Sequence, residues 1–124
     1  ANTYSGTTTV TAGTLQLNKA TGVTAINGNV SVGAGAVLLL SASDQVSDTS
    51  EVTLSGGTLQ RGGGVNEGMG DLTLTSGSTL DYGTGAAGTL TFGTYAPSLT
   101  TKLVLSNFGL DNKLRFVGSD LTGF

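Results

Sequence analysis

The sequence contains no histidine and no cysteine among its 124 residues. Their absence excludes Ser-His-Asp and Cys-His catalytic arrangements and the usual zinc ligand sets. It also excludes disulfide bonds, so cysteine usage does not reveal the redox compartment and is compatible with export. We therefore predict a chain that is not an enzyme, with no catalytic, cofactor-binding or metal-binding residues and no cofactor.

Charge is also scarce in this sequence. Charged residues form 10% of the chain and the formal net charge is -3, whereas roughly 25% of residues are charged in an average domain. The five lysines and arginines are scattered, so they form no basic patch of the kind that neutralises phosphates. The longest apolar run covers residues 36–40, far short of the roughly 20 residues that span a bilayer. We expect no nucleic-acid partner and no membrane span.

Glycine, with 21 residues, and threonine dominate the composition, and proline occurs once. Glycine at this frequency opposes helix formation because each helical glycine costs about 1 kcal/mol. No window has apolar residues at helical spacing, whereas valine, leucine and threonine recur at the short, regular intervals that favour strands. The length fits one domain. We predict a single all-β domain over residues 1–124 with essentially no helix.

A repeat of about twenty residues organises the chain. Four copies of one strand-turn-strand unit cover residues 10–17, 32–39, 54–60 and 74–80. In each copy the turn ends on glycine, which has the backbone freedom that a tight corner needs. The marker glycines Gly13, Gly35, Gly57 and Gly77 lie 22, 22 and 20 residues apart. Such a period corresponds to one coil of a solenoid.

Stacking these copies predicts a right-handed parallel β-helix, or β-solenoid, of about five or six coils. A hairpin sandwich also uses short strands and glycine turns, but it gives no reason for one unit to repeat in register. Equivalent aliphatic residues are expected to form an inward ladder at Val10, Val32, Leu54 and Leu74, with Thr and Ser pointing outward. At about 4.8 Å per coil, the body would be a rod of about 25 to 30 Å.

The repeat coils extend over about residues 1–93, and the coils over about residues 94–124 are more divergent. We expect strands at residues 89–92, 102–105 and 113–117. Residues 96–98, which include the only proline, are expected to interrupt the strands.

Residues 2–15, NTYSGTTTVTAGTL, resemble the autotransporter-associated β-strand repeat of bacterial passenger domains. The segments DQVSDT (44–49), VTLSGGTL (52–59) and LTLTSGSTLDYG (72–83) are similar to the end of such arrays in exported PEP-CTERM-type proteins. Residues 102–124 resemble the stretch before their sorting signal. The resemblance implies a secreted bacterial β-solenoid used at the cell surface for adhesion, matrix or display, without catalytic residues. Neither a signal-peptide pattern nor a Pro-Glu-Pro sorting tail is present, so we expect an extracellular or cell-surface protein whose export signal is absent from this chain.

Several acidic residues were weighed as candidate sites. Asp44, Asp48 and Glu51 form the only acidic cluster in the sequence. Their spacing fits a solvated loop between coils, with weak calcium binding as the alternative because carboxylate oxygens suit a hard cation. Asp71 and Asp81 flank one strand segment, but no lysine or arginine lies nearby in the sequence to stabilise a sugar carboxylate. A carbohydrate-active β-helix enzyme is therefore an outlier.

Glycine-rich segments and aromatic residues also favour structural roles. Residues 83–88, GTGAAG, match the spacing of a dinucleotide fingerprint, but that motif requires a following helix, and a strand is expected here. We predict loops for this segment and for residues 62–64 and 68–71. The aromatic residues are too dispersed for one sugar-stacking row and are expected in the core or at the ends: Tyr4, Tyr82, Phe92, Tyr95, Phe108, Phe116 and Phe124.

The ends of a solenoid expose apolar core and unpaired backbone groups unless something covers them. The sequence shows no polar capping helix near Ala1 or Phe124, so loops, further chain or neighbouring molecules must cover the ends. We therefore expect a structural subunit that self-associates end to end into a surface or matrix filament. The alternative is an adhesin or passenger fragment that binds a host or surface partner.

Overall fold

The fold is a stack of short parallel strands in three sheets. The structure is a computed structural model and describes residues 1–97 and 101–117. The first sheet contains β1 (Thr8–Val10), β3 (Val30–Val32), β5 (Val52–Ser55), β8 (Leu72–Ser76) and β11 (Tyr95–Pro97). The second contains β2 (Thr14–Leu17), β4 (Val37–Leu40), β6 (Thr58–Arg61), β9 (Ser78–Asp81) and β12 (Leu103–Ser106). The third contains β7 (Glu67–Gly68), β10 (Thr89–Phe92) and β13 (Lys113–Phe116).

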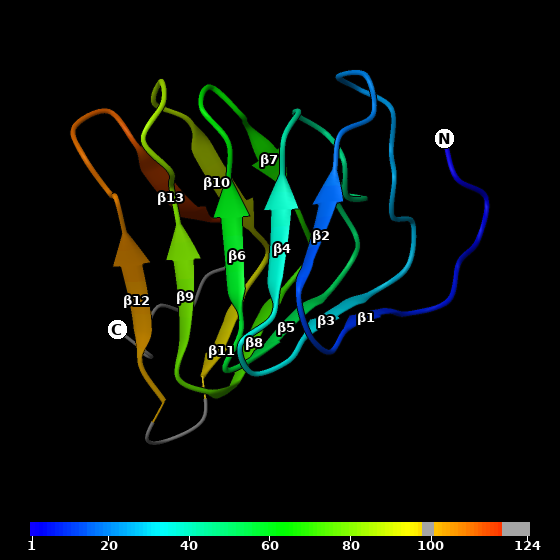
Figure 1. Cartoon of the computed structure of the whole chain (residues 1–124), viewed down its shortest axis with the longest axis horizontal. Coiled ribbons are helices and arrows are strands. Elements are labelled where there is room, and N and C mark those ends of the chain that lie inside the picture. The colour runs from blue at the N-terminus through cyan, green and yellow to red at the C-terminus, as the bar shows by residue number, and fades with distance from the viewer. Residues whose placement is uncertain (98–100, 118–124) are drawn as a thin grey trace.

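These sheets form the faces of a β-solenoid, as predicted. Each of the first two sheets contributes one strand per coil, which gives five coils, and coil 5 contains β11, β12 and β13. In Figure 1 the second sheet faces the viewer, and the chain ascends each of its strands, returns behind it, and advances from β2 at the right to β12 at the left. This path is right-handed. The described residues include no helix, and hence none that could cross a membrane.

Equivalent positions of successive coils stack on one another. Val10 pairs with Val32, Val32 with Leu54 and Leu54 with Leu74, and all four side chains are buried. The predicted inward ladder is confirmed. A second ladder crosses the second sheet at Leu15, Leu38, Leu59, Leu80 and Leu105. Since strand side chains alternate between faces, this register keeps the residues of both ladders on the inner face.

Glycines shape the corner between the first and second sheets. Gly13 and Gly35 have φ angles of 69° and 74°, in the left-handed region that disfavours a residue with a Cβ atom. In the third coil the left-handed residue is Gly56, at 87°, one position before the marker glycine identified in the sequence. Gly57 serves packing instead, because a Cβ atom there would lie 2.5 Å from Cγ1 of Val32 in the preceding coil.

The divergent coils keep the same stacking, with two differences from the sequence prediction. The strands expected at residues 89–92, 102–105 and 113–117 are present as β10, β12 and β13, within one residue at each end. Gly68, expected in a loop, belongs to β7, where pairing with β10 outweighs its low strand propensity. Residues 96–97, expected to interrupt the strands, belong to β11; β11 is an edge strand, where proline is tolerated. Ser98 lies outside the described residues.

Leu59→Ala is expected to lower the free energy of unfolding by about 2–5 kcal/mol, because it opens a cavity in the second ladder. Leu59 is fully buried. Gln60→Ala, on the outer face of the same strand, is the matched control and should change stability by less than about 0.5 kcal/mol. Urea denaturation followed by circular dichroism measures both, and equal losses would contradict the assigned inner face.

Candidate functional site

Coil 5 carries most of the large apolar side chains that are exposed among the described residues. One of these exposed side chains, Tyr4, lies near the other end of the molecule. The others all belong to coil 5: Val104, Leu105, Phe108, Leu110 and Val117. Leu110 is 95% exposed and Val117 is 70% exposed. A single exposed apolar residue is ordinary, but several gathered at one end of a molecule mark an interaction surface. We call these five residues the apolar end.

This exposure arises because no described strand stacks beyond coil 5. Leu105 continues the second ladder and is 37% exposed, whereas Leu80, its partner in coil 4, is fully buried. Leu103, Leu114 and Phe116 also pack against the core but are only partly buried. Among the described strands, β11, β12 and β13 each form the edge of their sheet.

The two ends of the solenoid differ in charge. Around the apolar end, Lys102, Asp111, Lys113 and Arg115 are all exposed, which gives residues 101–117 a formal charge of +2 (three positive, one negative). At the other end, residues 1–29 contain Lys19 as their only charged side chain. The remaining described acidic residues lie between the ends, within residues 44–81.

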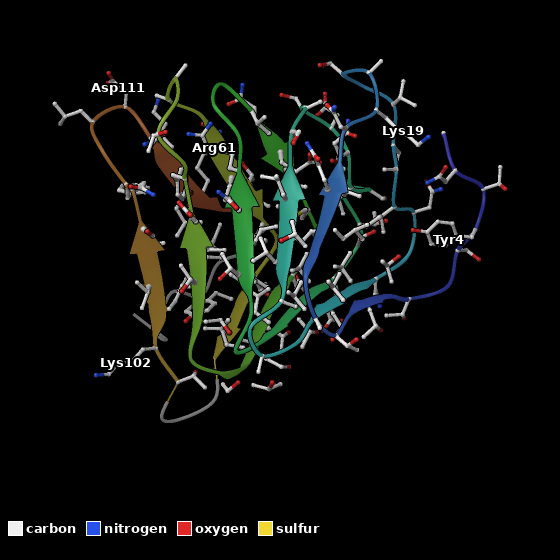
Figure 2. All side chains as sticks on the ribbon, in the orientation of Figure 1. Tyr4, Lys19, Arg61, Lys102 and Asp111 are labelled. Atoms are coloured by element: carbon white, nitrogen blue, oxygen red, sulfur yellow. The ribbon has the colours of Figure 1, made fainter. Side chains whose placement is uncertain are left out.

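A buried arginine organises the corner beside the apolar end. Arg61 on β6 stacks on Leu40, which stacks on Leu17, and it is fully buried. Figure 2 labels it near the upper side of the rod. Its guanidinium donates hydrogen bonds to the carbonyl oxygens of Gly62 (2.8 Å), Val65 (3.3 Å), Tyr82 (2.9 Å) and Ala86 (3.1 Å) and to Oδ1 of Asn112 (3.0 Å). These acceptors belong to three successive coils, so one side chain ties their corner loops together.

The charge of Arg61 is balanced by dipoles, because none of these five acceptors is a carboxylate. Burial lowers its pKa from the usual value, an effect that nearby Tyr82 opposes, and an arginine in a protein nevertheless stays protonated. The guanidinium carbon lies 5.3 Å from the centroid of the Tyr82 ring, within cation–π range. Its Nε has no hydrogen-bond partner among the described residues.

Tyr82 and Asn112 connect this corner to the apolar end. Tyr82 donates its hydroxyl hydrogen to the Lys113 carbonyl at 2.9 Å, and its ring meets Phe108 edge to face at 4.9 Å. Burial raises the pKa of Tyr82 to about 12, so it remains protonated at neutral pH. Asn112 Oδ1 accepts from the Gly88 backbone N–H at 3.1 Å as well as from Arg61. The loop that carries Phe108 and Leu110 is therefore held in place from inside the solenoid.

An open hollow of about 700 Å³ lies between the corner loops of coils 4 and 5. Its walls include Gly83, Thr84, Gly85, Leu105, Phe108 and Leu110. None of the residues that line it is ionised at neutral pH. The hollow thus offers shape and apolar contact but no acid or base for chemistry.

A buried glutamate bridges coils 2 and 3. The Glu67 carboxylate accepts hydrogen bonds from the backbone N–H groups of Gln45, at 2.8 Å, and Val46, at 3.0 Å. Burial raises the pKa of Glu67 to about 7; the two N–H donors oppose this shift, and the charges of Asp44 and Asp48 add to it. Arg115 of β13 borders the same surface recess as Glu67 and Asp44. Glu67 thus replaces a backbone acceptor where the ladder between these coils is interrupted.

The acidic residues considered from the sequence are not assembled into a site. Asp44, Asp48 and Glu51 are exposed between β4 and β5, in the predicted solvated segment. Asp71 accepts from the Thr94 N–H and Asp81 from the Gly83 N–H, at different corners of the solenoid. The described part of the chain contains no group of three or more Asp, Glu, His or Cys placed to hold a metal ion.

The glycine-rich and aromatic residues follow the prediction more closely. Residues 83–88 form a loop and β10 follows directly, so no helix N-terminus is available for a pyrophosphate. Tyr82, Phe92 and Tyr95 are buried, while Tyr4 and Phe108 are exposed near opposite ends. Phe116 stacks on Phe92 and Tyr95 at centroid distances of 5.8 and 5.5 Å. Phe124 lies outside the described residues.

Sequence reasoning missed Arg61 and Glu67. For Arg61 a signal exists: it occupies the repeat position that Leu17 and Leu40 fill in the two preceding coils, and a charge in an aliphatic ladder must be specially accommodated. The repeat copies defined from the sequence, residues 32–39 and 54–60, end one residue before Leu40 and Arg61 and so leave this position out. Glu67 gives no such signal, because its role depends on an interrupted ladder that only the structure reveals.

Arg61→Leu is expected to lower the free energy of unfolding by about 2–4 kcal/mol, although leucine fits the ladder position. The loss would come from carbonyl groups of three coils that are left without a donor. Arg115→Leu, which removes an exposed arginine, should cost less than about 0.5 kcal/mol. Guanidinium denaturation compares the two variants; equal stability of wild type and Arg61→Leu would show that the corner does not depend on the guanidinium.

Glu67 should make stability depend on pH. Its folded-state pKa of about 7 lies above the usual glutamate value of 4.5, so the folded protein binds the proton more tightly than the unfolded chain. The stabilisation is complete below about pH 4.5 and is lost as pH rises through 7, on the order of 2–3 kcal/mol. Glu67→Gln should flatten this slope between pH 5 and 8, whereas Glu51→Gln should retain it. Urea midpoints across this range test the assignment, and an unchanged slope in Glu67→Gln would refute it.

Comparisons of the chain with models of known protein families, with curated proteins and with solved structures find no match. The resemblance of residues 2–15 to the autotransporter-associated repeat stays a prediction. A function for the chain rests on its own residues, and the apolar end is the surface where they point most directly to one.

Proposed function

We propose that the chain is a non-catalytic structural β-solenoid that self-associates through its ends into a filament. The observation that carries this proposal is the apolar end, where five large apolar side chains are exposed on the last coil that the structure describes. Burial of such side chains contributes about 25 cal/mol per Å² of apolar surface. Association at this end is therefore the interaction that the surface favours most.

The internal architecture supports an end-to-end contact. Within the second sheet, each coil pairs with its neighbours in parallel and in one repeated register. A coil of another copy that packs on an end would therefore meet the same kind of surface that packs between coils inside the chain. The low charge of the chain, -3 over 124 residues, leaves little electrostatic repulsion between copies. Contacts between two different ends do not close on themselves and so produce filaments.

The proposed setting is the bacterial cell surface or the extracellular matrix. The resemblance of residues 2–15 and 72–83 to repeats of exported passenger proteins supports this location. A chain without cysteine is compatible with an oxidising environment, since no thiol needs protection. A filament of β-solenoid subunits would act there as scaffold or matrix material.

Electron microscopy and sedimentation velocity across a concentration series test the proposal. Regular fibres are expected to appear as concentration rises, with an axial repeat of about 24 Å for five coils at about 4.8 Å each. Monodisperse short rods at every concentration would overturn it and would favour an adhesin that acts as a monomer.

A matched pair of variants assigns assembly to the apolar end. Leu110→Glu places a charge on its most exposed residue and should raise the critical concentration about tenfold or more without loss of fold. Gln60→Glu adds the same side chain to the outer face of β6, in the middle of the rod, and should assemble like the wild type. Inhibition by both variants alike would point to lateral rather than end contacts.

A further inference from the structure

The side of the solenoid formed by the third sheet carries acids on one coil and bases on another. Figure 1 shows the strands of this sheet, β7, β10 and β13, behind the second sheet. Asp44 and Asp48 of coil 2 are exposed beside β7: Asp44 lines a surface recess together with Arg115, and a Cβ atom on Gly68 would lie 3.2 Å from Oδ1 of Asp48. Lys113 and Arg115 are exposed on β13, in coil 5.

The strand register aligns these charges across the coils. Arg115 pairs with Thr91, and Thr91 pairs with Gly68, which lies beside Asp48. Lys113, two residues before Arg115, takes the neighbouring outer position of the same strand. The outer positions between the acids and the bases, in coils 3 and 4, are uncharged. Three coil steps of about 4.8 Å therefore separate the two acids from the two bases, about 14 Å in all.

The other two sheets offer no comparable pattern. Glu51 and Asp71 directly precede β5 and β8 of the first sheet, and Asp81 ends β9 of the second sheet. All three are acids, and the base nearest to these sheets is Lys102, before β12. Two copies that met through either sheet would mainly bring acids together. The third sheet is the side of the rod on which one copy presents both signs of charge as pairs.

A two-fold axis makes this side complementary to itself. If the axis runs parallel to the strands and passes between coils 3 and 4, it reverses the direction of the second solenoid. Coil 2 of each copy then faces coil 5 of the other, so both pairs of acids meet pairs of bases. A two-fold axis parallel to the solenoid would instead set coil 5 against coil 5 and oppose like charges. A two-fold contact uses the same patch on both copies, as this side requires.

We propose that two copies bind side by side and antiparallel through their third sheets, with Asp48 of each copy paired with Arg115 of the other. The partner of this side is thus a second copy of the chain. The contact is small, so it belongs to the class of weak interfaces, and its charges select the orientation more than they add affinity. It is separate from the end contact proposed above and would join filaments laterally.

Charge exchange tests this pairing by sedimentation equilibrium at low salt, in the Leu110→Glu background that suppresses end contacts. Asp48→Lys and Arg115→Glu each place like charges at both contacts, so each should weaken the dimer about tenfold. An equimolar mixture of these two variants should form mixed dimers about as tightly as the parent protein, because opposite charges again face each other. The double variant Asp48→Lys/Arg115→Glu should recover for the same reason. Salt at about 0.5 M should shrink the differences.

A control variant and the pattern of outcomes separate this inference from the proposed function. Lys102→Glu makes the same change of charge as Arg115→Glu in the same coil but near the second sheet, as labelled in Figure 2, and should change dimerisation less than about twofold. An equal effect of both variants, or a mixture that fails to recover, would overturn the antiparallel pairing. A Leu110→Glu protein that stays monomeric while the wild type forms fibres would overturn the side contact alone. Dimers in this background together with a wild type that never forms fibres would overturn the filament alone.

Discussion

The structure depends on one constraint, the parallel register in which each residue stacks on its counterpart in the neighbouring coil. Leu38, Leu59 and Leu80 are fully buried because each has a leucine on both sides. In a parallel solenoid each coil packs only against its nearest neighbours. An inner coil therefore buries its apolar residues against two other coils, and a terminal coil against one. The exposure of Leu105 is the direct result. The apolar end is thus no separate module; it is the repeating core surface at the place where the described stacking stops.

Two buried ionisable side chains add contacts that strand pairing does not supply, and one of them, Arg61, reaches beyond the neighbouring coil. Arg61 replaces a ladder leucine and binds carbonyl oxygens and an amide oxygen from coils 3, 4 and 5, while Glu67 binds two backbone N–H groups of coil 2. Burial of a charge is costly unless hydrogen bonds compensate for lost water. Arg61 is the last residue of β6, where the chain turns towards the third sheet, whereas Glu67 lies on β7 and binds backbone N–H groups of coil 2. Arg61 therefore stabilises a corner, and through Asn112 it also shapes the loop that carries Leu110.

The regular part of this fold was predictable because its signal is repeated. Glycine spacing and the aliphatic ladder from Val10 to Leu74 identified the solenoid, its inner face and the approximate number of coils. The corners were less predictable, because their structure depends on contacts between coils rather than on local sequence. Gly56 rather than Gly57 takes the left-handed conformation, and Pro97 belongs to a strand because that strand is an edge. The sequence predicted that the ends of the solenoid expose apolar core unless something covers them. Which five residues form the apolar end became known only from their exposure in the structure.

The difference between the two ends limits the kinds of contact that the proposed end-to-end assembly could use. One end carries exposed apolar residues, and its residues 101–117 have a formal charge of +2, whereas the other end has a partly buried leucine and one lysine. Surfaces this unlike cannot both be satisfied by a two-fold dimer, since a two-fold axis pairs a surface with itself and leaves the opposite end open. A contact between unlike ends leaves one end of each kind at the tips of any assembly, whatever its length. Each added copy then restores the surface that it covers, so the contact itself sets no limit on growth, and length depends on the concentration of free subunits.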